Sequence, residues 1–307
     1  MEKRLIDDIY NWLENYKRYS VKQATYDRLL VSCHLLSHSE LSTMPSGVIR
    51  TEHLQRYLNR LHGDGYSAST VKKQFTLLTA YFKYAMSQGD ISIPMYLGVE
   101  MPSKQARNVT GIKAYTKAEQ ERLNPVLDRL ESRMYGAAVL MLEAGLRVGE
   151  VLALTWDDIL WERKAVSINK TWVRLATNAR AFIQTGAKSE TSNRTIPLSK
   201  RALEILTKIR AQDDTGSAYI FPGEKDPNLP ATYSAIRYHL REACKEVNVP
   251  YKGTHSFRHT FATNCYYRGC DVKVLSKLLG HADVSITYNT YIHLFGDALD
   301  EMRKVIE

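Results

Sequence analysis

The sequence has no apolar run long enough to cross a membrane. Its longest run, from Ala137 to Leu142, ends at Glu143, whereas a transmembrane helix needs about 20 apolar residues. The first residues, Met-Glu-Lys-Arg, lack the apolar segment and the small-residue cleavage site of a secretion signal. These absences argue against a membrane or secreted protein, and we expect a cytoplasmic one.

Cysteine is scarce and unpaired in spacing. With no C-x-x-C motif, the chain offers neither a disulfide framework nor a recognisable zinc site. Two of the cysteines could be grouped with His281 as metal ligands, but no paired short spacing supports that. Glycine-rich nucleotide-binding loops are also missing, and we expect no metal or other cofactor. The four cysteines are Cys33, Cys244, Cys265 and Cys270.

The charge balance is positive. The 307 residues hold 42 Lys and Arg against 33 Asp and Glu, a formal net charge of +9, and 44% of them are hydrophobic. Such a length and composition are typical of a globular protein of two domains. The excess positive charge favours a polyanionic partner, most plausibly nucleic acid. Residues 1–105 and the remainder are both mildly basic, as expected of a clamp that touches DNA from two sides.

The first hundred residues carry the periodicity of amphipathic helices. Apolar side chains recur at helical spacing from Leu5 to Tyr16, and breaks at Pro45-Ser46-Gly47 and Gly63-Asp64-Gly65 separate later segments. This pattern predicts a helical N-terminal domain. Its helices are expected over 5–16, 23–37 and 51–61, and from an N-cap at Ser69 to Gly89.

Lys72, Lys73 and Lys83 lie on the last of these helices. Each is a candidate for contact with a DNA phosphate. A solvated helix face would carry the same residues, so the lysines alone do not decide between the two interpretations.

A second domain follows a change of character near residue 90. Residues 90–113 lose the helical periodicity and contain Pro94, Pro102 and a polar run, which is typical of a linker. Thr116 and Glu119 then have the spacing of a capping box. We therefore predict a helical domain over 1–100, a linker over 101–114 and a second domain over 115–307.

The second domain mixes helices with a few strands. Strand signals cover residues 165–168, 181–183 and 195–198, which predicts one small sheet. Asp271 is a good N-cap for the last strong helix, and Gly280 a good C-terminal stop. The fold class is therefore mostly α with a small antiparallel β-sheet in the C-terminal domain. Its helices are expected over 135–143, after Gly149, and over 200–209, 232–247, 254–266 and 271–279.

Candidate functional residues gather near the C-terminus. His255, Arg258 and His259 stand at i, i+3 and i+4 behind Thr254, a candidate N-cap, so they share one face of a first helical turn. The free N–H groups of such a turn favour an anion. Two arginines suit the two non-bridging oxygens of a phosphate, because each guanidinium presents a rigid fork of donors. The second arginine would be Arg147, far upstream.

Four ordered motifs carry a family resemblance. They are Gly145-Leu146-Arg147-Val148-Gly149-Glu150, His255-Ser256-Phe257-Arg258-His259, Leu279-Gly280-His281 and Tyr288-Asn289-Thr290-Tyr291. In order and spacing the chain resembles the tyrosine recombinases, the phage integrase family. The resemblance covers residues 116–307 closely. It extends more loosely to 1–100, which look like the helical core-DNA-binding domain of that family.

The resemblance implies a role for each residue. Arg147 and Arg258 would bind the scissile phosphate, and Tyr291 would attack it to leave a 3′-phosphotyrosyl link. His255 would act as a general base or acid, and His281 would donate a hydrogen bond to the phosphate. Tyr288 competes for the role of nucleophile, but Tyr291 stands where the Tyr-x-His ending of the family places it.

The catalytic lysine of the family lies on a β-hairpin and protonates the leaving 5′-oxygen. Lys188 has the family's distance from the Arg194-Thr195-Ile196-Pro197 segment and is our candidate. Lys170, in the same sheet region, is the alternative. No cluster of carboxylates is present to hold magnesium, and a phosphotyrosyl ester conserves the energy of the broken bond, so neither metal nor ATP is expected.

The resemblance also implies partners. The substrate would be a double-stranded DNA recombination site, processed through a Holliday junction by a homotetramer. A C-terminal helix at about 296–307 would be exchanged between protomers, unless it docks on its own core. DNA-bending accessory proteins are possible partners. The chain begins with the core-binding helices, so we expect either a simple recombinase or one from which an arm-binding domain has been removed.

Two other functions stay open from the sequence. A type IB topoisomerase uses the same kinds of catalytic residues but relaxes supercoils without site specificity. A DNA-binding regulator could keep the fold without catalysis, although retention of all the candidate residues argues against it. We expect a recombinase of a phage or mobile element, acting on DNA in the cytoplasm of a prokaryote.

Overall fold

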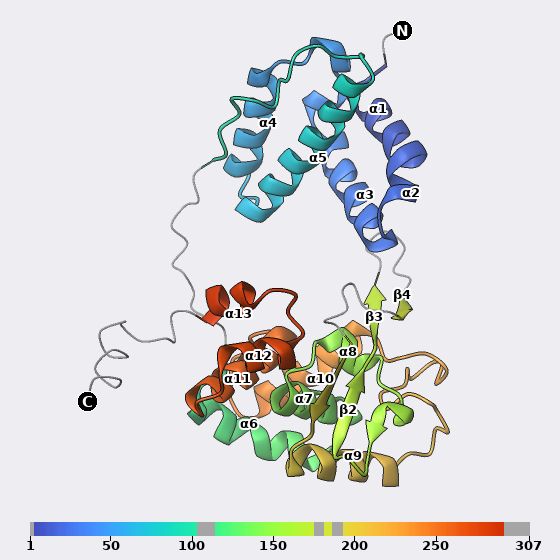
Figure 1. Ribbon diagram of the computed structural model, residues 1–307, viewed down its shortest axis with the longest axis vertical. Coiled ribbons are helices and arrows are strands. Elements are labelled where there is room, and N and C mark those ends of the chain that lie inside the picture. The colour runs from blue at the N-terminus through green and yellow to red at the C-terminus, as the bar shows by residue number, and fades with distance from the viewer. Residues whose placement is uncertain (1–2, 103–113, 175–180, 186–192, 292–307) are drawn as a thin grey trace, which may run out of the picture. The chain divides into compact units, whose positions relative to one another are not determined.

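The computed structural model describes residues 3–102, 114–174, 181–185 and 193–291. The chain divides into two compact units (Figure 1). The first comprises residues 1–109 with 174–181, and the second comprises 110–173 with 182–307. Most of the predicted linker, 103–113, lies outside the described residues, so the boundaries of 101–114 stay a prediction.

The first unit is a helical bundle around an apolar core. Leu5, Ile9 and Leu13 are fully buried, as their spacing predicts, and they pack with Leu54 and Phe82 from later helices. The helices are α1 (Leu5–Trp12), a π-helical turn (Leu13–Lys17), α2 (Arg18–Ser20), α3 (Gln23–Ser37), α4 (Thr51–Gly63) and α5 (Ala68–Ser87), with short 3₁₀ turns at Glu40–Thr43 and Ser46–Val48.

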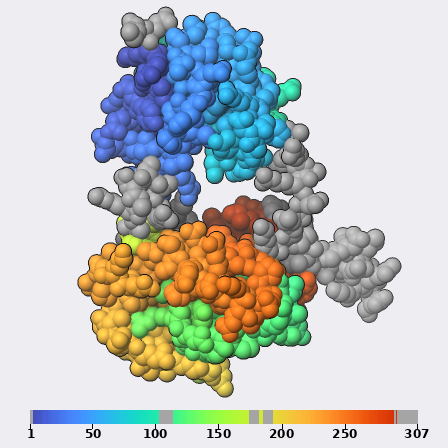
Figure 2. Space-filling view, turned by 180° about the vertical axis from the view of Figure 1, so that it is seen from behind, coloured from blue at the N-terminus to red at the C-terminus, as the bar shows by residue number. Residues whose placement is uncertain are grey.

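The second unit is built around α7 (Arg133–Ala144). Its residues from Met134 to Leu142 are all buried, because the helix packs against α6, α8, α9, α10 and α11. Figure 2 shows α6 in green beside the orange helices that follow it much later in the chain. The surrounding helices are α6 (Lys117–Arg129), α8 (Val148–Leu152), α9 (Lys200–Ala211), α10 (Tyr233–Glu246), α11 (Thr254–Tyr267), α12 (Val272–Leu279) and α13 (Val284–Tyr291).

The described strands form two small sheets rather than the single one predicted. In the first, β2 lies between β1 and β5 and pairs antiparallel with both, with Val166 opposite Ile159 and Ile196. The second sheet pairs β3 with β4. The strands are β1 (Ile159–Leu160), β2 (Ala165–Ile168), β3 (Lys170–Arg174), β4 (Ala181–Thr185) and β5 (Arg194–Pro197).

Helix starts test the capping predictions. The capping box of Thr116 and Glu119 is present, with both reciprocal hydrogen bonds, and Asp271 caps α12 through the N–H groups of residues 273 and 274. The prediction of Ser69 as the cap of α5 is wrong. Ser67 is the cap, because its backbone is extended and its hydroxyl accepts from Thr70 N.

The predicted N-cap of α11 is also wrong. Thr254 is the first helical residue, and the cap is Gly253, with φ at +99°. That backbone region is readily accessible only to glycine. The shift keeps His255 and Arg258 in the first two turns of the helix, so the predicted grouping of these side chains is unaffected.

Candidate active site

Arg147 is the N-cap of α8, three residues after Ala144, the last residue of α7. Gly145 ends α7 with φ at +65°, and a Cβ there would lie 2.4 Å from a ring carbon of Phe261. After this turn, Arg147 makes two hydrogen bonds to Glu150. Its backbone N–H donates to Oε2 at 2.8 Å, and its Nη1 donates to Oε1 at 2.8 Å. The side chain of Arg147 stays 36% exposed.

Arg258 reaches the same place from α11. It is only 7% exposed. Its Nη1 donates to the carbonyl oxygen of Gly145 at 2.8 Å, and its Nη2 lies 3.0 Å from Nε2 of His281. Because α7 and α11 pack together, the two arginines predicted from motifs 111 residues apart lie in one site.

The C-terminal end of α12 is the point on which three arginines converge. The last carbonyl groups of a helix lack intrahelical partners and carry partial negative charge, so they attract guanidinium groups. Gly280 ends the helix with φ at +63°. The three contacts are Arg194 Nε to Leu278 O at 2.7 Å, Arg258 Nη2 to Leu279 O at 2.6 Å, and Arg147 Nη2 to Gly280 O at 3.0 Å.

Glu150 supplies the negative charge within this cluster. It is 5% exposed and accepts from Arg194 through both oxygens, at 3.0 and 2.8 Å, as well as from Arg147. Burial by itself would raise the pKa of the Glu150 carboxyl. The hydrogen bonds and charge of Arg194, and then the charge of Arg147, outweigh burial and lower that pKa to about 2.

His281 follows Gly280 and is held as a neutral imidazole. Burial, and then the charges of Arg258 and Arg147, lower its pKa to about 4. A guanidinium can only donate, so Nε2 of His281 accepts from Arg258. Nδ1 lies 2.7 Å from Oγ1 of the buried Thr287 and carries the proton. The predicted role of His281 as a donor to phosphate therefore requires Nε2 to gain a proton.

Two further histidines lie near this cluster. His255 stands on the first turn of α11, and desolvation, followed by the charges of Arg258 and Arg147, lowers the pKa of its imidazole. For His259, desolvation and then the proximity of His255 and Arg258 lower the pKa. Both rings are therefore biased toward the neutral form, in which an imidazole can accept a proton.

Other predicted site residues lie wholly or partly outside the described regions. Lys188 falls in 186–192 and the predicted exchange helix in 296–307, both outside the described residues. Tyr291 is the last residue of α13, and only its backbone is described. On the same helix, the competing Tyr288 is 46% exposed.

The alternative lysine, Lys170, makes an ion pair within its own sheet region. Its Nζ lies 2.5 Å from Oδ2 of Asp158, which is buried, and 3.2 Å from Oγ1 of Thr155. Its side chain is 17% exposed. The Nζ of Lys170 is therefore engaged by Asp158 and Thr155, and the choice between Lys188 and Lys170 stays a prediction.

The lysines proposed to contact DNA lie on α5 in the first unit. Lys72 and Lys73 are exposed. Lys83 is also exposed, and its Nζ stands 5.6 Å from the centre of the Tyr96 ring, a cation–π distance.

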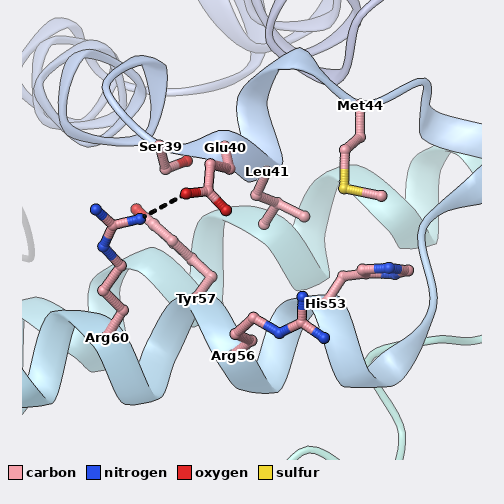
Figure 3. Close-up of a pocket in the computed structure, with 8 residues that line it drawn as sticks. All are labelled: Ser39, Glu40, Leu41, Met44, His53, Arg56, Tyr57 and Arg60. Carbon is pink, nitrogen blue, oxygen red and sulfur yellow. Dashed lines mark hydrogen bonds and ion pairs between the residues drawn. The ribbon is translucent and has the colours of Figure 1, made fainter.

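A small pocket in the first unit lies between α4 and the 3₁₀ turn at Glu40–Thr43 (Figure 3). Arg60 and Glu40 form an ion pair at its edge, with Nη1 and Oε1 3.1 Å apart, and Arg56 projects from the neighbouring turn of α4. Its volume of about 70 Å³ is far below the roughly 300 Å³ at which small-molecule sites begin. It is therefore a surface depression and not a cofactor site.

Sequence reasoning gave no role to Glu150 or Arg194. Both stood inside motifs that were used for their spacing, Glu150 three residues after Arg147 and Arg194 at the start of Arg-Thr-Ile-Pro. An acid at i+3 of a helix-capping arginine is a usable signal for a local ion pair. The contact between Arg194 and Glu150 joins residues 44 apart in the chain, and no local pattern predicts it.

Two arginines and a histidine lie around a helix end, on a mostly helical unit with a small antiparallel sheet, which is the arrangement expected of the catalytic domain of a tyrosine recombinase. Residues 113–297 match the model of the phage integrase family, and the chain belongs to that family. It is a tyrosine-type site-specific DNA recombinase of the transposon or phage type. The resemblance predicted from the four motifs is confirmed.

Curated relatives that match over most of this chain support this assignment. A tyrosine recombinase XerC-like protein of Caldanaerobacter subterraneus subsp. tengcongensis is 28% identical, over 94% of this chain and 78% of that protein. The integrase of Staphylococcus phage L54a is 25% identical, over 96% of this chain and 90% of its own.

Solved structures share the fold. The Tn1549 transposon integrase (residues 82–397 of that protein) in complex with circular intermediate DNA covers all of both chains, with a TM-score of 0.80 and 20% identity. A lambda integrase tetramer bound to a Holliday junction matches 92% of this chain and 78% of its own, with a TM-score of 0.66 and 18% identity. Among the described helices, none is long and apolar enough to span a bilayer.

Proposed function

We propose that this recombinase integrates or excises a phage or mobile element, cutting and rejoining DNA at a specific site through Tyr291. The observation that carries the proposal is the convergence of Arg147, Arg258 and His281 at the end of α12. The DNA segment is a double-stranded recombination site, and no metal or nucleotide takes part.

Phosphate binding is the task of the two arginines. Arg147 is 36% exposed, so part of its fork of donors is open to a ligand. Arg258 is buried with its Nη2 on a histidine nitrogen. A bound phosphodiester accepts from both guanidinium groups, which also stabilise the extra negative charge of the pentacoordinate transition state.

Strand cleavage then proceeds by transesterification. The Tyr291 oxygen attacks phosphorus, the bond to the 5′-oxygen breaks, and a 3′-phosphotyrosyl link with a free 5′-hydroxyl results. A phenol has an ordinary pKa of about 10 and is a weak nucleophile near neutral pH. Its proton passes to a base, for which His255 is our candidate because its pKa is lowered toward the neutral form, while Lys188 protonates the 5′-oxygen as it leaves.

Rejoining uses the reverse reaction with the 5′-hydroxyl of a second strand. The phosphotyrosyl bond conserves the energy of the phosphodiester, so ATP is not consumed. Two such exchanges pass through a Holliday junction. The lambda integrase has been solved as a tetramer bound to such a junction, which supports a homotetramer for this chain. In that tetramer, residues 296–307 would be exchanged between protomers.

The first unit contributes DNA affinity in this proposal. Lys72, Lys73 and Lys83 contact phosphates of the site, and each contact releases a counterion. DNA-bending accessory proteins assist assembly. Because its substrate is DNA and its relatives come from bacteria and a phage, the enzyme acts at the nucleoid, in the cytoplasm of a prokaryotic host.

The decisive experiment is Tyr291→Phe on a nicked suicide site. Wild type should accumulate a covalent protein–DNA adduct, and Tyr291→Phe should form none while still binding the site. Tyr288→Phe is the matched control and should retain the adduct. If Tyr288→Phe lost the adduct and Tyr291→Phe kept it, the assignment of the nucleophile would be wrong.

A further inference from the structure

Arg194 lies at the centre of the site although no step of the proposed reaction uses it. It is the first residue of β5, and its side chain is 7% exposed. Its Nη1 and Nη2 donate to the two oxygens of Glu150 at 3.0 and 2.8 Å, and its Nε donates to Leu278 O at 2.7 Å. The guanidinium thereby joins β5, α8 and the end of α12.

Glu150 is shared between Arg194 and Arg147. The same Oε1 accepts from Arg147 Nη1 at 2.8 Å and from Arg194 Nη1 at 3.0 Å. One buried negative charge therefore lies between two positive ones. With Arg194 present, the three groups sum to a charge of +1, which is available to a phosphate at the more exposed Arg147. Without Arg194, Glu150 would neutralise Arg147 alone.

The chain around the contact is shaped to admit this guanidinium. A Cβ on Gly280 would lie 2.8 Å from Nη1 and 3.1 Å from Cζ of Arg194. These distances are below an ordinary van der Waals contact of about 3.5 Å. The glycine in the Leu279-Gly280-His281 motif thus leaves the space through which Arg194 reaches Glu150.

We infer that Arg194 is a positioning residue for phosphate binding: by pairing with Glu150, it keeps the charge of Arg147 available to the scissile phosphate. The inference rests on the proposed function. It predicts that loss of Arg194 harms the reaction through the non-bridging oxygens of the phosphate, and not through protonation of the leaving 5′-oxygen.

The test compares three nicked suicide sites that differ at the scissile position. One carries the natural phosphodiester, one a neutral methylphosphonate, and one a 5′-bridging sulfur, whose thiolate leaves without a proton. Arg194→Gln should cleave the natural site roughly 100-fold more slowly than wild type, as expected for a displaced catalytic group. The defect should be at least tenfold smaller on the methylphosphonate and unchanged on the bridging-sulfur site.

Partial unfolding cannot imitate this pattern, because it lowers the rate on all three sites equally. Arg133→Gln is a matched control, since Arg133 forms a part-buried ion pair with Asp213 at 3.0 Å, at the opposite end of α7 from Gly145. The ratio of the wild-type cleavage rate to the Arg133→Gln cleavage rate should be the same on all three sites. Arg194→Lys, which keeps the charge, should recover most of the rate lost in Arg194→Gln.

Three results would overturn the inference. These are an equal defect on all three sites, a defect relieved only by the bridging sulfur, or Arg194→Lys as slow as Arg194→Gln. Failure of the proposed function looks different, because wild type itself would then form no adduct on the natural site.

Discussion

Replacing Glu150 by Gln tests the stability of the arginine cluster. The carboxylate is 5% exposed and binds Arg147 and Arg194. Glutamine keeps the shape and one acceptor oxygen but has no charge, and its NH₂ group would face a guanidinium. Two half-buried or buried positive charges would then lose their common partner.

The pKa of Glu150 gives the magnitude. Its ordinary value of 4.5 is lowered to about 2 in the fold, and each unit corresponds to about 1.4 kcal/mol. The ionised form is therefore stabilised by about 3 kcal/mol in the folded state. Because the folded pKa is depressed, this contribution is complete above pH 4.5 and is lost as the pH falls toward 2. At pH 7 the substitution should remove all of it.

The assay is thermal and urea unfolding of the full chain at pH 7, following the transition of the second unit. A loss of about 3 kcal/mol corresponds to a melting temperature lower by about 6–12 °C for a unit of this size. Between pH 4.5 and 3 wild type should lose stability more steeply than Glu150→Gln. Glu121→Gln, at an exposed position of α6, is the control and should change little.

The reasoning fails if Glu150→Gln unfolds within about 1 kcal/mol of wild type at pH 7, given that breaking a buried ion pair typically costs 3–5 kcal/mol. It also fails if both proteins lose stability equally between pH 4.5 and 3. Either result would mean that the two arginines are stabilised by water and backbone carbonyls without the carboxylate.

Further predictions concern other parts of the molecule. Gly145→Ala would put a side chain on a residue with φ of +65° and its Cβ 2.4 Å from Phe261. It should lower the free energy of unfolding by about 1–3 kcal/mol, measured by urea unfolding. The imidazole of His281 has a pKa of about 4 in the free protein, and this pKa should rise by at least one unit on DNA, since phosphate favours the protonated ring. NMR titration would measure it, and an unchanged pKa would contradict the prediction. Lys72→Ala with Lys73→Ala should reduce the slope of log affinity against log salt by about 2.

The helical plan could be predicted from local patterns because each helix buries one face. The apolar run Ala137–Leu142 predicts the central helix. The caps at Thr116 and Asp271 are hydrogen bonds between residues close in sequence, so the residue types alone predict them. Ser67 and Ser69 are equally good caps as residue types. Which of the two serines has an extended backbone depends on how α5 packs. The local sequence does not determine that packing.

Motifs in the sequence pointed to three residues that the fold brings together, but the contacts between them could not be predicted. Family-like spacing identified Arg147, Arg258 and His281, and the fold brings them together. The direction of the contact between Arg258 and His281 depends on burial, which lowers the pKa of the imidazole. Pairing between Arg194 and Glu150 depends on β5 lying beside the end of α12, a tertiary fact.

The hydrogen bonds at the end of α12 determine how mutations in this helix should behave. Three successive carbonyl groups, of Leu278, Leu279 and Gly280, each accept from a different arginine. A substitution that shifts this helix end by a fraction of an ångström disturbs all three arginines together. Mutations in α12 should therefore mimic the displacement of several of these arginines at once, and their effects should not add to those of single arginine substitutions.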